Sequence, residues 1–188
     1  TSLIVSLLVV FSSLSYAGVL LKEQHFMYEG AFRVPRNNLG GDSSYPQSLA
    51  RGGGGLTFNT INNSLILFGR GSEKLAAEIS IPLPIIDASI ANLNTASVVQ
   101  VPGDVANSQW NYLTMDGSAI GNGGSTGGLL VYNNKLIGSA FGFYDAAYVG
   151  AKSHFKASLT WATTGSQFDG FHRVGNSPIG GVNGGWVG

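Results

Sequence analysis

Cysteine is absent from this sequence, and charged residues make up only 11% of its 188 residues, against about 25% in an average protein. Without cysteine, the chain has no disulfides and no thiolate metal sites. Ten basic and ten acidic residues give a net charge of zero, and the basic residues form no run. A positive field that would attract nucleic acid is therefore missing, and we expect no nucleic-acid partner.

Motifs for cofactors, metals and nucleophiles are also missing. The chain has no GxxxxGK[ST] phosphate loop and no HExxH zinc pair, and its three histidines lie far apart in the sequence. The oxygen-rich loop around Asp116 carries one carboxylate, fewer than calcium loops use. A GxSxG match at Ser125 precedes a predicted strand, which is not the setting of a nucleophile elbow. We predict no metal and no cofactor, and the sequence identifies no catalytic residue.

Glycine, by contrast, is abundant: there are 28, about twice the average share of about 7%. With so few charged residues, this composition favours short strands and tight turns over long helices. The segment GGGGLTFNTINNSLILFG (52–69) has two apolar runs around an asparagine turn and predicts a β-hairpin. The segment AAEISIPL (76–83) alternates as a strand does, with Ala77 and Ile79 on one face and Glu78 on the other.

The hairpin pattern recurs as GGLLVYNNKLIGSAFG (127–142), 73 residues later when Leu56 is aligned with Leu129. Propeller blades repeat every 40 to 50 residues or so, so we expect an insertion with few strand-forming residues at 87–122. Each hairpin precedes a further strand candidate. Three strands and a possible fourth per unit match a propeller blade. We therefore predict an all-β fold, a partial β-propeller-like array of antiparallel blades over residues 18–188; the alternative is two unrelated hairpins of similar composition.

The first 17 residues resemble a secretory signal peptide. An apolar block, Leu3 to Phe11, is followed by a small-residue stretch ending at Ala17, and the block is shorter than the roughly 20 residues that span a bilayer. We expect a secreted or periplasmic protein with no membrane span in the mature chain; the alternative is a buried first element. Since no initiator Met or basic region precedes Leu3 and a strand is expected to start near Gly188, we expect the natural protein to continue beyond both ends. An incomplete array would leave apolar sheet edges exposed.

Several segments together resemble an uncharacterised group of secreted bacterial propeller-like proteins. They are MYEGAFRVP (27–35), the glycine-rich hairpin with AAEISIP (76–82), and SHFKASLTWATTGSQFDGFHRVG (153–175). The resemblance extends over most of Phe26 to Gly188. It implies a fold and an export route, and it brings no catalytic residues to this chain.

Three clusters combine aromatic and ionisable side chains: SQWNYLTMDG (108–117), FGFYDAAY (141–148) and KSHFK (152–156). Aromatic faces beside hydrogen-bonding groups suit sugar rings. The alternative is that these aromatics fill the core between sheets and the charged residues cap turns. The candidate ligand-binding residues are Trp110, Tyr112, Asp116, Tyr144, Asp145 and His154.

Two functional classes remain open. The first is a non-catalytic exported propeller that binds glycans or extracellular protein partners, or acts as a scaffold. The second is a propeller-fold hydrolase or lyase acting on extracellular polysaccharide, which needs paired carboxylates or a Tyr/His pair on one face. Asp116, Asp145, Tyr144 and His154 could supply these groups. Two carboxylates facing each other across a cleft would support the enzyme, whereas carboxylates on separate turn tips would contradict it.

Overall fold

The computed structural model describes residues 20–36, 39–40, 49, 54–69, 74–161 and 167–175. In these residues the regular elements are eight strands and two single-turn 3₁₀ helices, η1 (Glu23–His25) and η2 (Ile90–Asn92). The predicted all-β class is confirmed. No helix in this part of the chain has the length and apolar character needed to cross a bilayer. The signal-like segment 1–17 lies outside the described residues, so its assignment stays a prediction.

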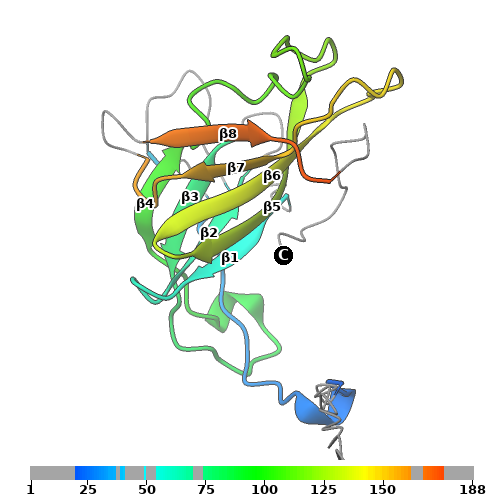
Figure 1. Ribbon diagram of the computed structural model, residues 1–188. Helices are drawn as coiled ribbons and strands as arrows, with labels where there is room; N and C mark the ends of the chain where they lie inside the picture. Colours follow the sequence, from blue (N-terminus) through cyan, green and yellow to red (C-terminus); the bar gives the residue numbers. More distant parts are fainter. Residues whose placement is uncertain are drawn as a thin grey trace, which may run out of the picture.

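The strands form two four-stranded antiparallel sheets, each ordered as in the sequence (Figure 1). The first sheet consists of β1 (Leu56–Asn59), β2 (Ser64–Phe68), β3 (Ala76–Ser80) and β4 (Val98–Gly103). The second consists of β5 (Gly124–Tyr132), β6 (Lys135–Gly142), β7 (His154–Ala157) and β8 (Phe168–His172). Both predicted hairpins are present, each with two further strands. The described residues do not close a ring of sheets.

One strand lies where the sequence predicts an insertion with few strand formers. β4 falls inside residues 87–122 and pairs with β3 through Glu78 opposite Gln100 and Ile79 opposite Val98. The strand forms because β3 offers an open edge and the stretch from Val98 to Val101 has three β-branched residues. Pro102 is tolerated because β4 is itself an edge strand.

The two hairpins match closely beside their turns and differ in the turns themselves and farther along, where β5 and β6 pair irregularly between Thr126 and Leu129. β5 and β6 are joined by Asn133 and Asn134, whose φ angles are 47° and 59°, as the two-residue turn of type I′ requires. The β1–β2 loop is two residues longer, since its ladder closes at Asn59 opposite Ser64. Beside the turns, the sequence difference between the two copies therefore lies in the loop, and the strands align residue by residue.

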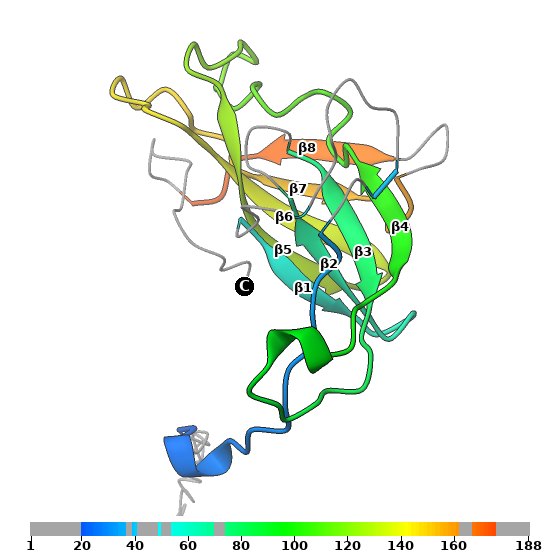
Figure 2. The ribbon, with the colours of Figure 1, turned by 180° about the vertical axis from the view of Figure 1, so that it is seen from behind.

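The two sheets are stacked on each other (Figure 2), and the aligned hairpins turn different faces toward each other. Counted from the turns, Ile66 matches Ile137, and Leu65 matches Leu136. Ile66 and Leu136 lie in the core between the sheets. Leu65 instead packs in a second cluster with residues of the N-terminal segment, and Ile137 is half-buried on the other face of the second sheet. The sheets are thus stacked face to back, in the same orientation, and not as a two-fold sandwich.

The glycine pair before β1 lies close against the start of the second sheet. A Cβ on Gly55 would lie 2.8 Å from the carbonyl oxygen of Gly127, and a Cβ on Gly54 would lie 2.5 Å from Thr126 Oγ1. Neither position has room for a side chain. Beside them, the backbone N–H of Val131 donates a hydrogen bond of 3.0 Å to Thr57 Oγ1. Gly54 and Gly55 therefore serve close packing between the sheets, whereas a Cβ on Gly127 would collide with Ser139 of its own sheet.

Glu78 lies on the face opposite Ala77 and Ile79, as predicted, but that face is covered by the second sheet and the residue is fully buried. Its carboxylate accepts hydrogen bonds from the side chains of Asn59 (2.8 Å), Asn62 (2.9 Å), Ser64 and Gln100. The Gln100 amide also donates to the Leu159 carbonyl at 2.8 Å, which links the first sheet to the β7–β8 connection. Burial raises the pKa of Glu78, but the four hydrogen bonds together outweigh it, and the pKa lies below its usual value.

Candidate functional site

The two long connections that carry most of the predicted site residues lie at one end of the molecule, at the top of Figure 1. There the β4–β5 connection (104–123) runs beside the β6–β7 connection (143–153). An antiparallel bridge joins Thr114 to Gly150, and the N–H of Lys152 donates to the Leu113 carbonyl at 2.7 Å. The end of β8 joins them through the N–H of Ser153, which donates to the His172 carbonyl at 2.9 Å. We call these two connections and the end of β8 the loop end.

Asp116 is held by its own turn. Its Oδ1 accepts hydrogen bonds from Thr114 Oγ1 at 2.6 Å and from the N–H of Ser118 at 3.0 Å. Chiefly through the Thr114 bond and then the Ser118 bonds, the pKa of Asp116 falls to about 2. The carboxylate therefore remains ionised at any ordinary pH.

Asp145 is used in the same way in the neighbouring connection. Its two oxygens accept hydrogen bonds from the N–H groups of Val149 at 3.0 Å and Gly150 at 2.8 Å. Asp104 repeats the arrangement with the N–H of Ala106 at 2.9 Å. Since each carboxylate stabilises the turn that carries it, the structure at these positions matches the alternative in which charged residues cap turns.

The aromatic candidates divide into buried and exposed residues. Trp110 lies in the core, with its ring centroid 5.5 Å from that of Phe68 and 5.4 Å from that of Phe155, both edge-on. Its Nε1 donates to Asp104 Oδ1 at 2.7 Å, so it presents no free face to a ligand. Tyr112 is 48% exposed and Tyr144 77% exposed. Only these last two could stack on a sugar ring.

His154 begins β7, and its Nδ1 lies 2.7 Å from Ser153 Oγ. Burial lowers the pKa of His154, which favours the neutral ring at physiological pH. In the ladder it lies opposite Ser139 on one side and His172 on the other. Although it is near the loop end, His154 lines neither of the two hollows there.

The first hollow, which we call the Tyr148 hollow, measures about 470 Å³. Its lining combines apolar and charged side chains from three segments, among them Met115, Asp116, Tyr148, Val149 and Arg173. Tyr148 is 62% exposed and has a φ of 54°, a left-handed conformation that is uncommon for a bulky residue. The volume of the Tyr148 hollow is within the range of about 300–1,000 Å³ found for small-molecule sites.

The second hollow, which we call the Lys152 hollow, measures about 420 Å³. It is lined by Gln109, Tyr112 and Gly117 from one connection, Lys152 from the other, and Gly170 and Phe171 from β8. Gly117 lies between Asp116 and Ser118, and Lys152 follows Ala151, all three of which line the Tyr148 hollow. The two hollows are therefore neighbours across shared segments.

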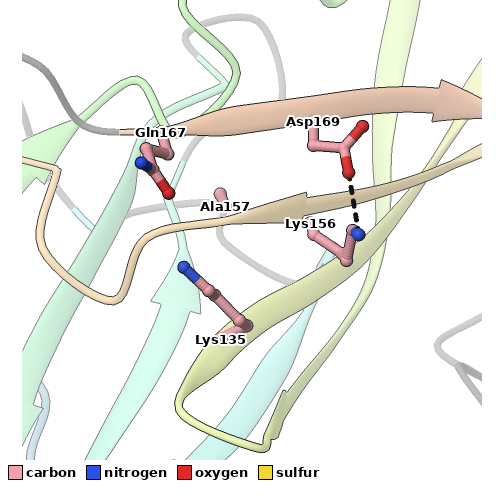
Figure 3. Close-up of a pocket in the computed structure, with 5 residues that line it drawn as sticks. All are labelled: Lys135, Lys156, Ala157, Gln167 and Asp169. Atoms are coloured by element: carbon pink, nitrogen blue, oxygen red, sulfur yellow. Dashed lines mark ion pairs between the residues drawn. The ribbon is translucent and has the colours of Figure 1, made fainter.

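Among the described residues, two further hollows lie away from the loop end. A small one of about 130 Å³ on the second sheet is lined by Lys135 and Gln167 and by Lys156 and Asp169, whose charged groups pair at 2.8 Å (Figure 3). Another, of about 280 Å³, lies at the hairpin turns beside Asn62 and Gln100. Both fall below the usual volume of ligand sites.

The structure brings Tyr112 and Asp116 to the two adjoining hollows and places Trp110, Tyr144, Asp145 and His154 elsewhere. The residues predicted from the sequence do not include five others that line these hollows, Gln109, Met115, Tyr148, Lys152 and Arg173. The sequence signal for Tyr148 and Lys152 was present, since both stand in the aromatic and basic clusters. Gln109, Met115 and Arg173 carry no such signal, because only the folded connections bring them to the site.

Comparisons with protein-family models, with curated proteins and with solved structures find no match to this chain. Within the described ranges, no three His, Asp or Glu side chains gather as they would around a metal ion. The loop end offers tyrosine faces, apolar patches and hydrogen-bonding groups, with Asp116 permanently charged. This chemistry suits binding of a polar ligand with apolar ring faces.

Proposed function

We propose that this chain is part of an exported β-propeller whose loop end binds glycans. The observation that carries the proposal is the lining of the Tyr148 hollow, where an exposed tyrosine, the apolar residues Met115 and Val149, and the acidic residue Asp116 share one surface. Sugar rings have apolar C–H faces and polar edges, and they match such a mixed surface. The signal-like segment at residues 1–17 supports export.

The stacking of the sheets supports the propeller. In a face-to-back stack, each sheet packs the same face against the next sheet and its opposite face against the sheet before it. Further sheets can therefore be added in the same way. A propeller is the closed form of such an array of four-stranded meanders. The resemblance to secreted propeller-like proteins, carried by three segments of the sequence, agrees with this architecture.

The backbone at the tyrosines supports binding at the loop end. Tyr144 and Tyr148 have φ angles of 56° and 54°, in a region that costs an L-residue roughly 1–2 kcal/mol. Residues held in such conformations cluster at functional sites. The Asp145 carboxylate, which bonds Val149 and Gly150, holds the connection in this shape.

The proposal is tested with the full chain and a panel of neutral and acidic oligosaccharides by isothermal titration calorimetry. For any oligosaccharide that binds, Tyr148→Ala should lower the affinity about fivefold to tenfold, because a stacking contact of about 1 kcal/mol is lost. The matched control is Tyr132→Ala, which removes a tyrosine of similar exposure at the opposite, hairpin-turn end. If no oligosaccharide binds, or if both variants bind like the parent, the proposal is wrong.

A polysaccharide hydrolase is not favoured. Such an enzyme needs a carboxylic acid with a raised pKa to protonate the leaving group, whereas the pKa of Asp116 is lowered to about 2. Asp145 does not line the Tyr148 hollow and is bonded to its own turn. A lyase would need His154 and a tyrosine to face one cleft, and His154 lines neither hollow.

A further inference from the structure

The polar side chains of the loop end differ in whether they form hydrogen bonds or ion pairs within the protein. All three carboxylates, on Asp104, Asp116 and Asp145, accept hydrogen bonds from nearby groups. In the Lys152 hollow, by contrast, the side chains of Gln109, Tyr112 and Lys152 have no hydrogen-bond or ion-pair partner among the described residues. These three unused groups come from two connections and converge on one hollow.

The position of Lys152 is fixed although its ammonium group is not. Its backbone N–H donates to the Leu113 carbonyl at 2.7 Å, and the next residue, Ser153, donates to the His172 carbonyl at 2.9 Å. Lys152 is half-buried. The main chain at Lys152 is therefore fixed beside the hollow that its side chain lines, and no described residue in that lining offers a counter-charge.

The hollow has one sign of charge. Among the described residues that line it, Lys152 is the only charged one, and Gln109 and Tyr112 add an amide and a hydroxyl. An anion placed against an ammonium group that has no other partner would make a charge-assisted hydrogen bond. The Gln109 amide and the Tyr112 hydroxyl can donate to the remaining oxygens.

We propose that the Lys152 hollow binds the carboxylate of an acidic sugar residue, so that the glycan bound at the loop end is a uronic acid oligomer. The inference rests on the proposed glycan binding and specifies its ligand class. One sugar ring lies in the Tyr148 hollow, and the neighbouring uronate lies in the Lys152 hollow with its ring beside Tyr112. The two hollows share the turn at Gly117 and the step from Ala151 to Lys152, which places consecutive sugar units in reach of both.

The test compares each acid with its own neutral derivative. Oligomers of galacturonate, glucuronate and mannuronate are titrated into the full chain beside their methyl esters, which keep the sugar ring and remove the charge. At least one acid should bind about ten- to a hundredfold more tightly than its ester, as expected for one hydrogen bond to a charged group. This advantage should shrink as salt is raised from low to physiological ionic strength.

Variants test whether Lys152 is responsible for the preference for acidic oligomers. Lys152→Gln should remove the preference for the acid and leave binding of the ester unchanged, while Lys152→Arg should retain the preference. Lys135→Gln is the matched control, because it removes one exposed lysine charge at the hairpin turns, away from the loop end. Thermal unfolding of each variant verifies that it is folded.

The outcomes separate the two proposals. If esters and acids bind alike, and Tyr148→Ala weakens both, glycan binding holds and the role of Lys152 is wrong. If acids are preferred and Lys152→Gln leaves the preference intact, the site assignment is wrong. If no oligomer of either kind binds, both the glycan function and this inference are overturned.

Discussion

The two sheets place different chemistry at the same position. Counted from the hairpin turns, Glu78 of the first sheet matches Lys156 of the second, and their partners on the edge strands, Gln100 and Asp169, match as well. Glu78 is fully buried and bonded only to neutral groups. Lys156 and Asp169 form an ion pair at 2.8 Å with both side chains 55% exposed.

Burial accounts for the difference. The second sheet covers the face that carries Glu78, so its carboxylate must find all its hydrogen bonds inside the protein. The corresponding face of the second sheet is more open, and there water can solvate two opposite charges. One position in the repeat can therefore hold a buried hydrogen-bond hub or a surface ion pair, depending on whether a sheet lies over it.

Trp110→Ala should produce the largest effect, because the indole fills the space between the sheets and contacts Phe68 of the first and Phe155 and Phe171 of the second. We expect a loss of about 3–5 kcal/mol in the free energy of unfolding, measured by urea denaturation. Trp110→Phe, which keeps part of the ring, should cost less. A loss below about 1 kcal/mol for the alanine variant would show that the sheets do not depend on this contact.

Glu78→Ala should come next. It leaves the donors of Asn59, Ser64 and Gln100 without their acceptor in a buried site, and we expect a loss of about 3 kcal/mol or more. Glu78→Gln, which keeps one acceptor oxygen, should lose less than Glu78→Ala. Equal midpoints in urea for Glu78→Ala and the parent would show that the hydrogen bonds to Glu78 do not stabilise the fold.

The pH dependence of stability should show how much the ionised carboxylate of Glu78 contributes. Because the pKa of folded Glu78 lies below its unfolded value of about 4.3, the stability that its ionised form contributes is present above that value. It is lost as pH falls from about 4.3 through the lower folded pKa. Unfolding free energies measured from pH 7 to pH 3 should therefore fall less steeply for Glu78→Gln than for the parent. Parallel curves would mean that Glu78 does not titrate differently in the two states.

Lys156→Ala should have the smallest effect, although it stands at the position that matches Glu78. An exposed ion pair contributes about 1 kcal/mol or less, and salt screens it. Urea midpoints should differ little from the parent at low ionic strength and should converge at high salt. A loss comparable to that of Glu78→Ala would show that the open face of the second sheet is covered.

Much of the fold follows from local sequence signals. The apolar runs around Asn62 and around Asn133 predict both hairpins, and the structure shows that the loop of the first is two residues longer. β4 was missed because its formation depends on an open edge of β3, which is a long-range property. The burial of Glu78 was likewise hidden, since alternation assigns a side chain to a face and does not say what covers that face.

The site was predictable only in part. Sequence composition identifies the aromatic clusters of the loop end. It does not distinguish Trp110, which is buried in the core, from Tyr112, which lines a hollow. That separation depends on which ring reaches Phe68 and Phe155 across the two sheets. The hollow at Lys152 could not be predicted, because it requires three segments that are distant in sequence to meet.

The close approach of Gly55 to the Gly127 carbonyl has a consequence for how such a chain can diverge. Where backbone meets backbone, evolution must preserve the absence of side chains and little else. Two glycines carry little information in a chain that has 28 of them. Units joined in this way can keep their geometry while the rest of their sequence drifts until neither the repeat nor its relatives are easy to detect.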